Sequence, residues 1–199
     1  REHAAEAFYT NSDHNVYLMP TDSNFPTGHA RNRSVQSSKG CITTDQIPDS
    51  SVLHSLYENS EFKSFLCRVL NEQALHKYAD PLSAINLHYA AEGQELGWHF
   101  DNSSFAITLL IQQPEAGADF EYVKDLRNAD AGDMNYAGVQ SVLDGESAVT
   151  TLNMDPGCLV LFRGRNSMHR VSPSKGDTTR MLVVLAYNTE PGVSLSESA

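Results

Sequence analysis

The feature that most constrains the fold is a series of short apolar segments in the second half of the chain, bounded by turn-forming residues. The run at 105–112 (FAITLLIQ) is almost continuously apolar, whereas 119–123 (DFEYV) alternates polar and apolar residues. The full set is 84–89, 105–112, 119–123, 147–152, 158–162 and 181–187, with turns at Asp155-Pro156-Gly157, Lys175-Gly176-Asp177 and Pro191-Gly192. Short strands separated by Gly and Pro are typical of a β-sandwich or jelly roll. We therefore predict a mainly β protein with flanking helices.

The first half of the chain carries weaker signals. Residues 1–47 are polar, with short apolar islands, and predict an irregular segment that holds one strand at most. After them, Asp49 or Ser50 can cap a helix, because short polar side chains accept hydrogen bonds from the first free N–H groups. Apolar residues spaced three and four apart then predict a second helix, which Asp80-Pro81 ends.

One domain is expected, because 199 residues are enough for one hydrophobic core and short for two. Residues 1–199 divide into the irregular segment 1–47, support helices in 48–79 and a β core in 80–192. Within that core, residues 125–146 are rich in Asp, Asn, Gly and Ala and predict a long loop with little core. Loops of this length are usually functional, so this one is a candidate lid.

A metal-ligand pattern lies in the segment Gly97-Trp98-His99-Phe100-Asp101. On an extended strand, side chains two positions apart point to the same side, so His99 and Asp101 can reach one metal. Taken alone, such a pair is more often a surface turn, but a second histidine, His169, follows in the strand-rich region. Two imidazoles and one carboxylate on one face of an ion form the facial triad of non-haem Fe(II) oxygenases. His99, Asp101 and His169 are therefore candidate metal ligands.

Three further residues are candidates to bind a cosubstrate. Arg180 lies eleven residues beyond His169, at the start of the last predicted strand. If it is buried there, its planar guanidinium can hold a carboxylate through two hydrogen bonds, whereas at a strand edge it would be solvated. Asn86 and His88 alternate on an earlier strand, and either can hydrogen-bond the same ligand. Of these two, Asn86 is preferred.

The order His99-x-Asp101, His169, Arg180 resembles that of the Fe(II)/2-oxoglutarate-dependent oxygenases, whose core is a double-stranded β-helix, a cupin-like jelly roll. Three runs are similar to a bacterial group that includes amino-acid halogenases and their hydroxylase relatives. They are GWHFDNSSFAITLLIQQPEAGADFEYV, GCLVLFRGRNSMHRVSPSKGD and TTRMLVVLAYNTEPG. The resemblance covers residues 80–192 and departs at Ala118, where a second glycine would be expected in the turn.

This resemblance implies a role for each candidate residue. His99, Asp101 and His169 would hold Fe(II), and Arg180 would bind the distal carboxylate of the cosubstrate 2-oxoglutarate. With O₂ as the oxidant, the enzyme would hydroxylate an unactivated C–H bond. In the halogenases of this group, a small residue stands at the carboxylate position and leaves room for chloride. Asp101 therefore favours hydroxylation over halogenation.

No motif defines the substrate. The net charge of −11 mildly favours a small cationic molecule such as a free cationic amino acid, and Arg31, Arg33 and Asn102 are candidates to bind it. The same charge disfavours nucleic acid and anionic membranes as partners. Two alternatives stay open, namely a hydroxylase of a protein or peptide side chain and a non-catalytic cupin-like binding domain. The oligomeric state is also open.

The cysteines bear on the compartment. Cys41, Cys67 and Cys158 are odd in number and widely spaced, which argues against a disulfide scaffold or a zinc knuckle. The sequence has no run of 18 apolar residues and no signal-peptide pattern. A cytoplasmic enzyme is therefore expected.

Overall fold

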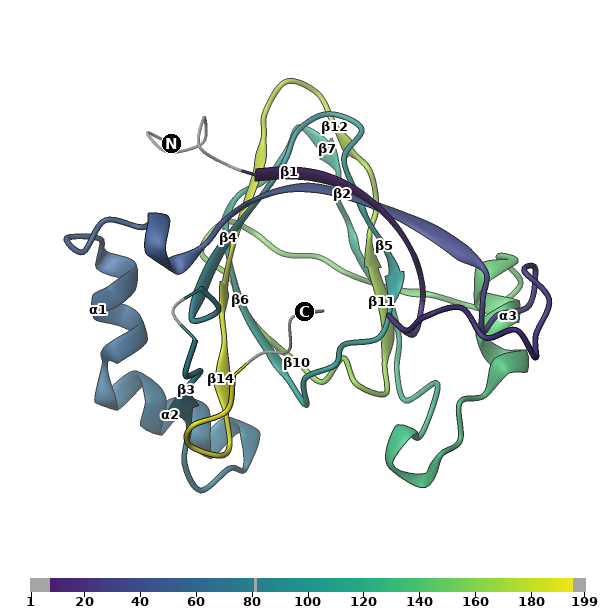
Figure 1. The fold of residues 1–199 in the computed structure, drawn as a ribbon. Coiled ribbons are helices and arrows are strands. Elements are labelled where there is room, and N and C mark those ends of the chain that lie inside the picture. The colour runs from purple at the N-terminus through teal and green to yellow at the C-terminus, as the bar shows by residue number, and fades with distance from the viewer. Residues whose placement is uncertain (1–7, 81, 195–199) are drawn as a thin grey trace.

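The computed structural model describes residues 8–80 and 82–194, which form two facing antiparallel sheets (Figure 1). The major sheet has the strand order β1-β2-β4-β13-β6-β10, and the minor sheet has the order β5-β11-β8-β9. From β4 to β13, the chain passes repeatedly from one sheet to the other. This arrangement is a double-stranded β-helix, as predicted from the sequence.

The elements have the following bounds. The major sheet consists of β1 (Phe8–Asn15), β2 (Ser34–Ile42), β4 (Ile85–Ala90), β13 (Arg180–Leu185), β6 (Ala106–Gln112) and β10 (Leu159–Phe162). The minor sheet consists of β5 (Leu96–His99), β11 (Met168–Val171), β8 (Phe120–Val123) and β9 (Thr150–Leu152). Two short pairs join β7 (Ala116–Gly117) to β12 (Ser174–Lys175), and β3 (His76–Lys77) to β14 (Tyr187–Asn188). The helices are α1 (Val52–Glu58), α2 (Ser60–Leu70) and α3 (Tyr136–Leu143), with 3₁₀ turns at Thr44–Gln46 and Ala129–Ala131.

The outer face of the major sheet packs against α1 and α2, which lie on one side of the molecule in Figure 1. Ile85 and Tyr89 of β4 point outward, as do Val183 and Leu185 of β13, and all four are buried. Because side chains alternate along a strand, the residues between them point into the jelly roll. The helices therefore support the sheet from outside and leave its inner face to the functional site.

The minor sheet packs outward against α3, which corrects the prediction of a coreless loop at 125–146. Val139 and Val142 of α3 are buried together with Trp98 of β5 and Met168 of β11. The sequence obscured this helix because it spans only Tyr136–Leu143 within a longer segment rich in Asp, Asn and Gly. Each fully buried valine contributes about 1.5–3 kcal/mol by leaving water. This segment is thus a packed support of the minor sheet.

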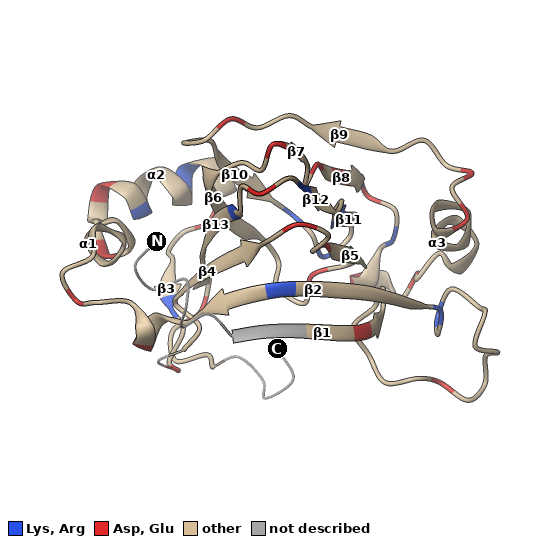
Figure 2. Cartoon of the chain, turned by 90° about the horizontal axis from the view of Figure 1, so that it is seen from above, with Lys and Arg blue, Asp and Glu red and all other residues tan. Residues whose placement is uncertain are grey.

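The prediction of an irregular segment at 1–47 is also wrong for its described part. Strands β1 and β2 pair along their whole length and extend the major sheet beyond β4. β2 also reaches the minor sheet, because the Ser38 N–H donates to Glu95 O at 2.8 Å and the Gly97 N–H donates to Ser37 Oγ at 3.0 Å. It therefore runs beside both β4 and β5 (Figure 2). Serine-rich strands held by such bonds lack the apolar alternation on which strand prediction depends.

The helix boundaries differ from the predictions. The cap of α1 is Ser51, whose side chain accepts from the Leu53 N–H, rather than Asp49 or Ser50. Helix α2 ends at Leu70, well before Asp80, because Asn71 adopts the left-handed conformation that terminates helices. Pro81 lies outside the described residues.

Other expectations agree with the structure. The predicted strands appear within a few residues of their expected bounds. Ala118 adopts a φ of 53°, so it takes the left-handed conformation of the glycine expected there. No helix among the described residues is long and apolar enough to cross a membrane.

Candidate metal centre

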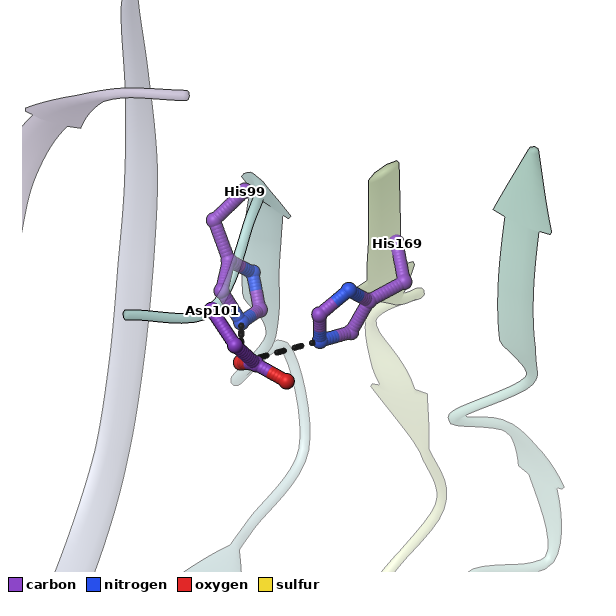
Figure 3. A group of neighbouring side chains, drawn as sticks. All are labelled: His99, Asp101 and His169. Atoms are coloured by element: carbon purple, nitrogen blue, oxygen red, sulfur yellow. Dashed lines mark ion pairs between the residues drawn. The ribbon is translucent and has the colours of Figure 1, made fainter. Parts of the chain in front are cut away.

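Two neighbouring strands of the minor sheet place the predicted metal ligands. His99 ends β5 and His169 lies in β11, and the two are direct partners in the antiparallel register. Their neighbours Trp98 and Met168 point outward into the core, so both imidazoles point inward. Asp101 follows two residues after β5 and turns its carboxylate toward both rings (Figure 3).

The three side chains converge on one point. Oδ1 of Asp101 lies 3.6 Å from Nε2 of His99 and 3.4 Å from Nε2 of His169. All three residues offer ligand atoms within 4.8 Å of one another. Ligand atoms that share one face of a metal ion with bonds of about 2.1 Å lie about 3 Å apart. The arrangement is therefore close to that of a facial triad.

Backbone carbonyl groups orient both imidazoles. Nδ1 of His99 donates to Gly97 O at 2.8 Å, and Nδ1 of His169 donates to Ser167 O at 3.0 Å. A donor role requires the proton on Nδ1, which leaves Nε2, the ring atom nearest Asp101, as the atom that binds a metal when the ring is neutral. Such a partner on the far nitrogen is the usual support of a metal-bound histidine. Both rings are 7% exposed or less, which keeps bulk water from them.

Asp101 provides a test of whether a cation fits this site. Burial raises the pKa of Asp101, but with no metal bound an imidazole proton on Nε2 of His169 or His99 can hydrogen-bond the carboxylate and hold this pKa below its usual value. Its Oδ2 is buried and has no hydrogen-bond partner. Burial, together with the neighbouring His169, also lowers the pKa of His99, which keeps that imidazole neutral. An ionised carboxylate with a free oxygen, beside two imidazoles whose Nε2 atoms face it, is a donor set that fits a divalent metal.

Arg180 lies at the start of β13, on the inner face of the major sheet. It is 6% exposed, and burial lowers its pKa to about 10. Within residues 8–80 and 82–194, no ion pair joins it to an acidic side chain. It borders a cavity of about 300 Å³, whose lining also includes Leu110 and Phe120 and, toward its rim, the acidic residues Glu115, Asp119 and Asp155. A buried guanidinium that forms no ion pair among the described residues suits an anionic ligand.

The other candidate cosubstrate ligands lie on β4. Asn86 and His88 face the same way as Leu182 and Val184 of β13, their neighbours in the register. Asn86 donates to Ser83 O at 3.3 Å and is near the Cys41 thiol. The ring of His88 contacts the ammonium group of Lys39. Both predicted residues thus line the interior of the jelly roll.

The candidate substrate residues lie farther out. Arg31 is buried beside the core on the outer side of the minor sheet, where it donates to Pro20 O at 2.9 Å. Arg33 pairs with Asp144 at the end of α3. The metal ligands are on the inner side of that sheet, so the structure does not bring these arginines to them. Asn102 is exposed, and its carbonyl accepts from Arg165 at 3.4 Å. Substrate binding by these three residues stays a prediction.

Sequence reasoning missed two residues of this site. The first is Lys39, which lies in the segment predicted to be irregular. If that segment is read as a strand, Lys39 and Cys41 are two positions apart and point to the same face, the interior of the jelly roll. The second residue is Gly164, in the segment between β10 and β11. Its lack of a side chain leaves the space that the carboxylate of Asp101 occupies.

The comparisons with known proteins agree with this geometry. Residues 22–198 match the sequence profile of the family described as Halogenase D. A 2OG-Fe(II) oxygenase-family oxidoreductase from Burkholderia pseudomallei superposes with a TM-score of 0.59 at 10% identity, covering 96% of this chain and 77% of that one. A prolyl-4-hydroxylase from Pseudomonas putida gives a TM-score of 0.45 at 11% identity, covering 75% of this chain and 71% of that one. No curated protein matches the chain.

Proposed function

The chain belongs to the Halogenase D family, and on this premise we propose that it is an Fe(II)/2-oxoglutarate-dependent dioxygenase that hydroxylates a small molecule. The cofactors are Fe(II), the cosubstrate 2-oxoglutarate and O₂. When bound, the iron couples the oxidation of 2-oxoglutarate by O₂ to the hydroxylation of a C–H bond. The products are succinate, CO₂ and an alcohol. The observation that carries the proposal is the convergence of His99, Asp101 and His169 on one point inside a double-stranded β-helix.

The residues of the chain position the reactants. His99 and His169 offer Nε2 to the metal, because their Nδ1 protons are engaged by carbonyl groups. Asp101 offers a carboxylate, and Arg180 binds the distal carboxylate of 2-oxoglutarate at the other sheet. Asn86 is the further residue assigned to the cosubstrate. Burial of all these groups excludes water, which strengthens their electrostatic interactions.

Hydroxylation, rather than halogenation, is the reaction assigned here. The carboxylate of Asp101 takes the coordination position that chloride would need. Its Oδ2 is enclosed and has no hydrogen-bond partner, so the carboxylate is free for the metal. The family contains proteins described as halogenases, and Asp101 is the residue by which this chain would depart from their chemistry.

The substrate proposed is a free amino acid, with a cationic side chain favoured by the net charge of −11. We also take residues 1–199 as one oxygenase domain, in which 80–192 hold the metal centre. A cytoplasmic location is supported by three free thiols, Cys41, Cys67 and Cys158.

The test is a substrate screen. Protein loaded anaerobically with Fe(II) and 2-oxoglutarate is exposed to O₂ with each member of a panel of amino acids. The proposal expects one or more of them to raise succinate release and to give a product heavier by one oxygen atom. If succinate is never formed, with or without a panel member, the chain is not such an enzyme.

A further inference from the structure

The interior of the jelly roll carries a second cation besides Arg180. In the register, Cys41 of β2 lies beside His88, and His88 lies beside Leu182, so these residues share the inner face of the major sheet. Lys39 is two residues from Cys41 on β2 and therefore points to the same face. It lies at the point where β2 passes between β4 and β5, the strand that ends at His99 (Figure 2).

Among residues 8–80 and 82–194, Lys39 contacts a histidine rather than an acidic side chain. Its Nζ lies 3.3 Å from Nε2 and 3.4 Å from Nδ1 of His88. Burial, together with Lys39 and Arg180, lowers the pKa of His88 well below 6.5, so this ring is neutral and supplies no counter-charge. In the described part of the chain, no acidic side chain forms an ion pair with Lys39. Burial accordingly lowers the pKa of Lys39 itself.

The charges inside the jelly roll therefore do not balance. Arg180 is buried there and Lys39 is half-buried, whereas the carboxylate of Asp101 is turned toward the two metal-binding imidazoles. An enclosed cation without a partner is costly unless a ligand supplies the opposite charge. Arg180 is assigned to 2-oxoglutarate, which leaves Lys39 available for another anion.

The positions of the two cations separate two binding sites. The registers Gly40↔Tyr89 and Arg180↔Ala90 place Lys39 and Arg180 on either side of Ala90. Two strand spacings separate their backbones by about 9–10 Å, and the variants below distinguish two separately bound carboxylates from one that both cations hold. Lys39 lies on the side of β5, and Asp101 is close enough to influence its pKa. The site at Lys39 thus borders the metal centre.

We propose that Lys39 binds a carboxylate group of the primary substrate and so holds it beside the metal centre. The inference rests on the proposed function and narrows it to substrates with a free carboxylate, such as a free amino acid. The main-chain carboxyl of a residue within a peptide is tied up in an amide bond, so the inference weighs against a protein substrate other than an acidic side chain or a chain's C-terminus. Lys39 is a specificity-determining residue in this account.

The test compares acids with their amides. The probes are free L-amino acids, the same amino acids as C-terminal amides, and propionate. Binding is measured anaerobically as the rise in melting temperature of the Fe(II)-loaded protein, with and without 2-oxoglutarate. At least one acid should stabilise the unaltered protein, and its amide should bind at least tenfold more weakly. Equal effects of acid and amide, or no carboxylate-dependent effect of any probe, would overturn the proposal.

Variants locate the effect at Lys39. Lys39→Met should weaken the acid at least tenfold and leave 2-oxoglutarate affinity within about twofold, and Lys39→Arg should restore part of the acid affinity. The matched control is Lys124→Met, because Lys124 is exposed at the surface. If Lys39→Met weakens 2-oxoglutarate and spares the acid, Lys39 belongs to the cosubstrate site and the proposal fails. Failure of the unaltered protein to bind 2-oxoglutarate counts instead against the proposed function. In that case, the affinity of the acid measured without 2-oxoglutarate, compared between the unaltered protein and Lys39→Met, still tests the role of Lys39.

Discussion

Gly164 lies directly against the carboxylate of Asp101. The Asp101 N–H donates to Gly164 O at 3.1 Å, and a Cβ atom on Gly164 would overlap that carboxylate. The same Cβ would lie 2.8 Å from Cε1 of His169, closer than side chains approach one another. The φ angle of Gly164 is not in the left-handed region, so space rather than conformation requires glycine. The position of Asp101, the third metal ligand, thus depends on a glycine in the segment between β10 and β11.

The first prediction concerns that space. Gly164→Ala should push Asp101 away from the two imidazoles and weaken Fe(II) binding about 10- to 100-fold, as loss of a supporting contact does at other metal sites. Isothermal titration with Fe(II) under anaerobic conditions measures this. Gly28→Ala is the matched control, because a Cβ there meets nothing within 4 Å. Equal Fe(II) affinity in the two variants would show that Gly164 does not position Asp101.

The second prediction concerns Arg180. Arg180→Lys should weaken 2-oxoglutarate binding about tenfold or more, because a point charge replaces the planar fork and one charge-assisted hydrogen bond is lost. Titration of the anaerobic Fe(II)-loaded protein with 2-oxoglutarate gives the affinity, and Arg68→Lys on the exposed face of α2 serves as the control. Unchanged affinity in Arg180→Lys would remove this residue from the cosubstrate site.

The third prediction concerns reaction outcome. In chloride buffer, the unaltered protein should form only hydroxylated product, since the carboxylate of Asp101 takes the position that chloride would need. Asp101→Gly vacates that position and could admit chloride, but chlorination should be poor because chloride needs supporting donors of its own. Mass spectrometry of the products decides. Chlorinated product from the unaltered protein would contradict the assignment of hydroxylation.

The fourth prediction concerns the stability of the metal-free protein in acid. Burial lowers the pKa of His88 well below the value of about 6.5 that it has in the unfolded chain. Below pH 6.5 the unfolded chain therefore binds more protons, and the free energy of unfolding should fall by up to about 1.4 kcal/mol per pH unit for this residue. His88→Gln should flatten that dependence between pH 6.5 and 5, while His99, whose pKa burial also lowers, retains part of it. Urea unfolding at several pH values measures both slopes, and identical slopes would contradict the prediction.

The sequence was sufficient for the parts whose chemistry is local. His99 ends one strand and Asp101 follows two residues later, so period-two alternation was enough to place both on one side, and Arg180 begins another predicted strand. Strand β2 could not be predicted in the same way, because its serines bond to β5 across the fold and show no apolar pattern. The roles of Lys39 and Gly164 depend on that long-range packing, so only the three-dimensional structure reveals them.

The central claim is that His99, Asp101 and His169 together hold the iron of a 2-oxoglutarate-dependent oxygenase. The most direct measurement is succinate formed from 2-oxoglutarate after O₂ is admitted to protein titrated with Fe(II). We predict that succinate rises to saturation at one Fe(II) per chain, that His169→Ala abolishes it, and that His76→Ala on β3 retains it. Succinate formed equally well by His169→Ala, or independently of Fe(II), would contradict the account.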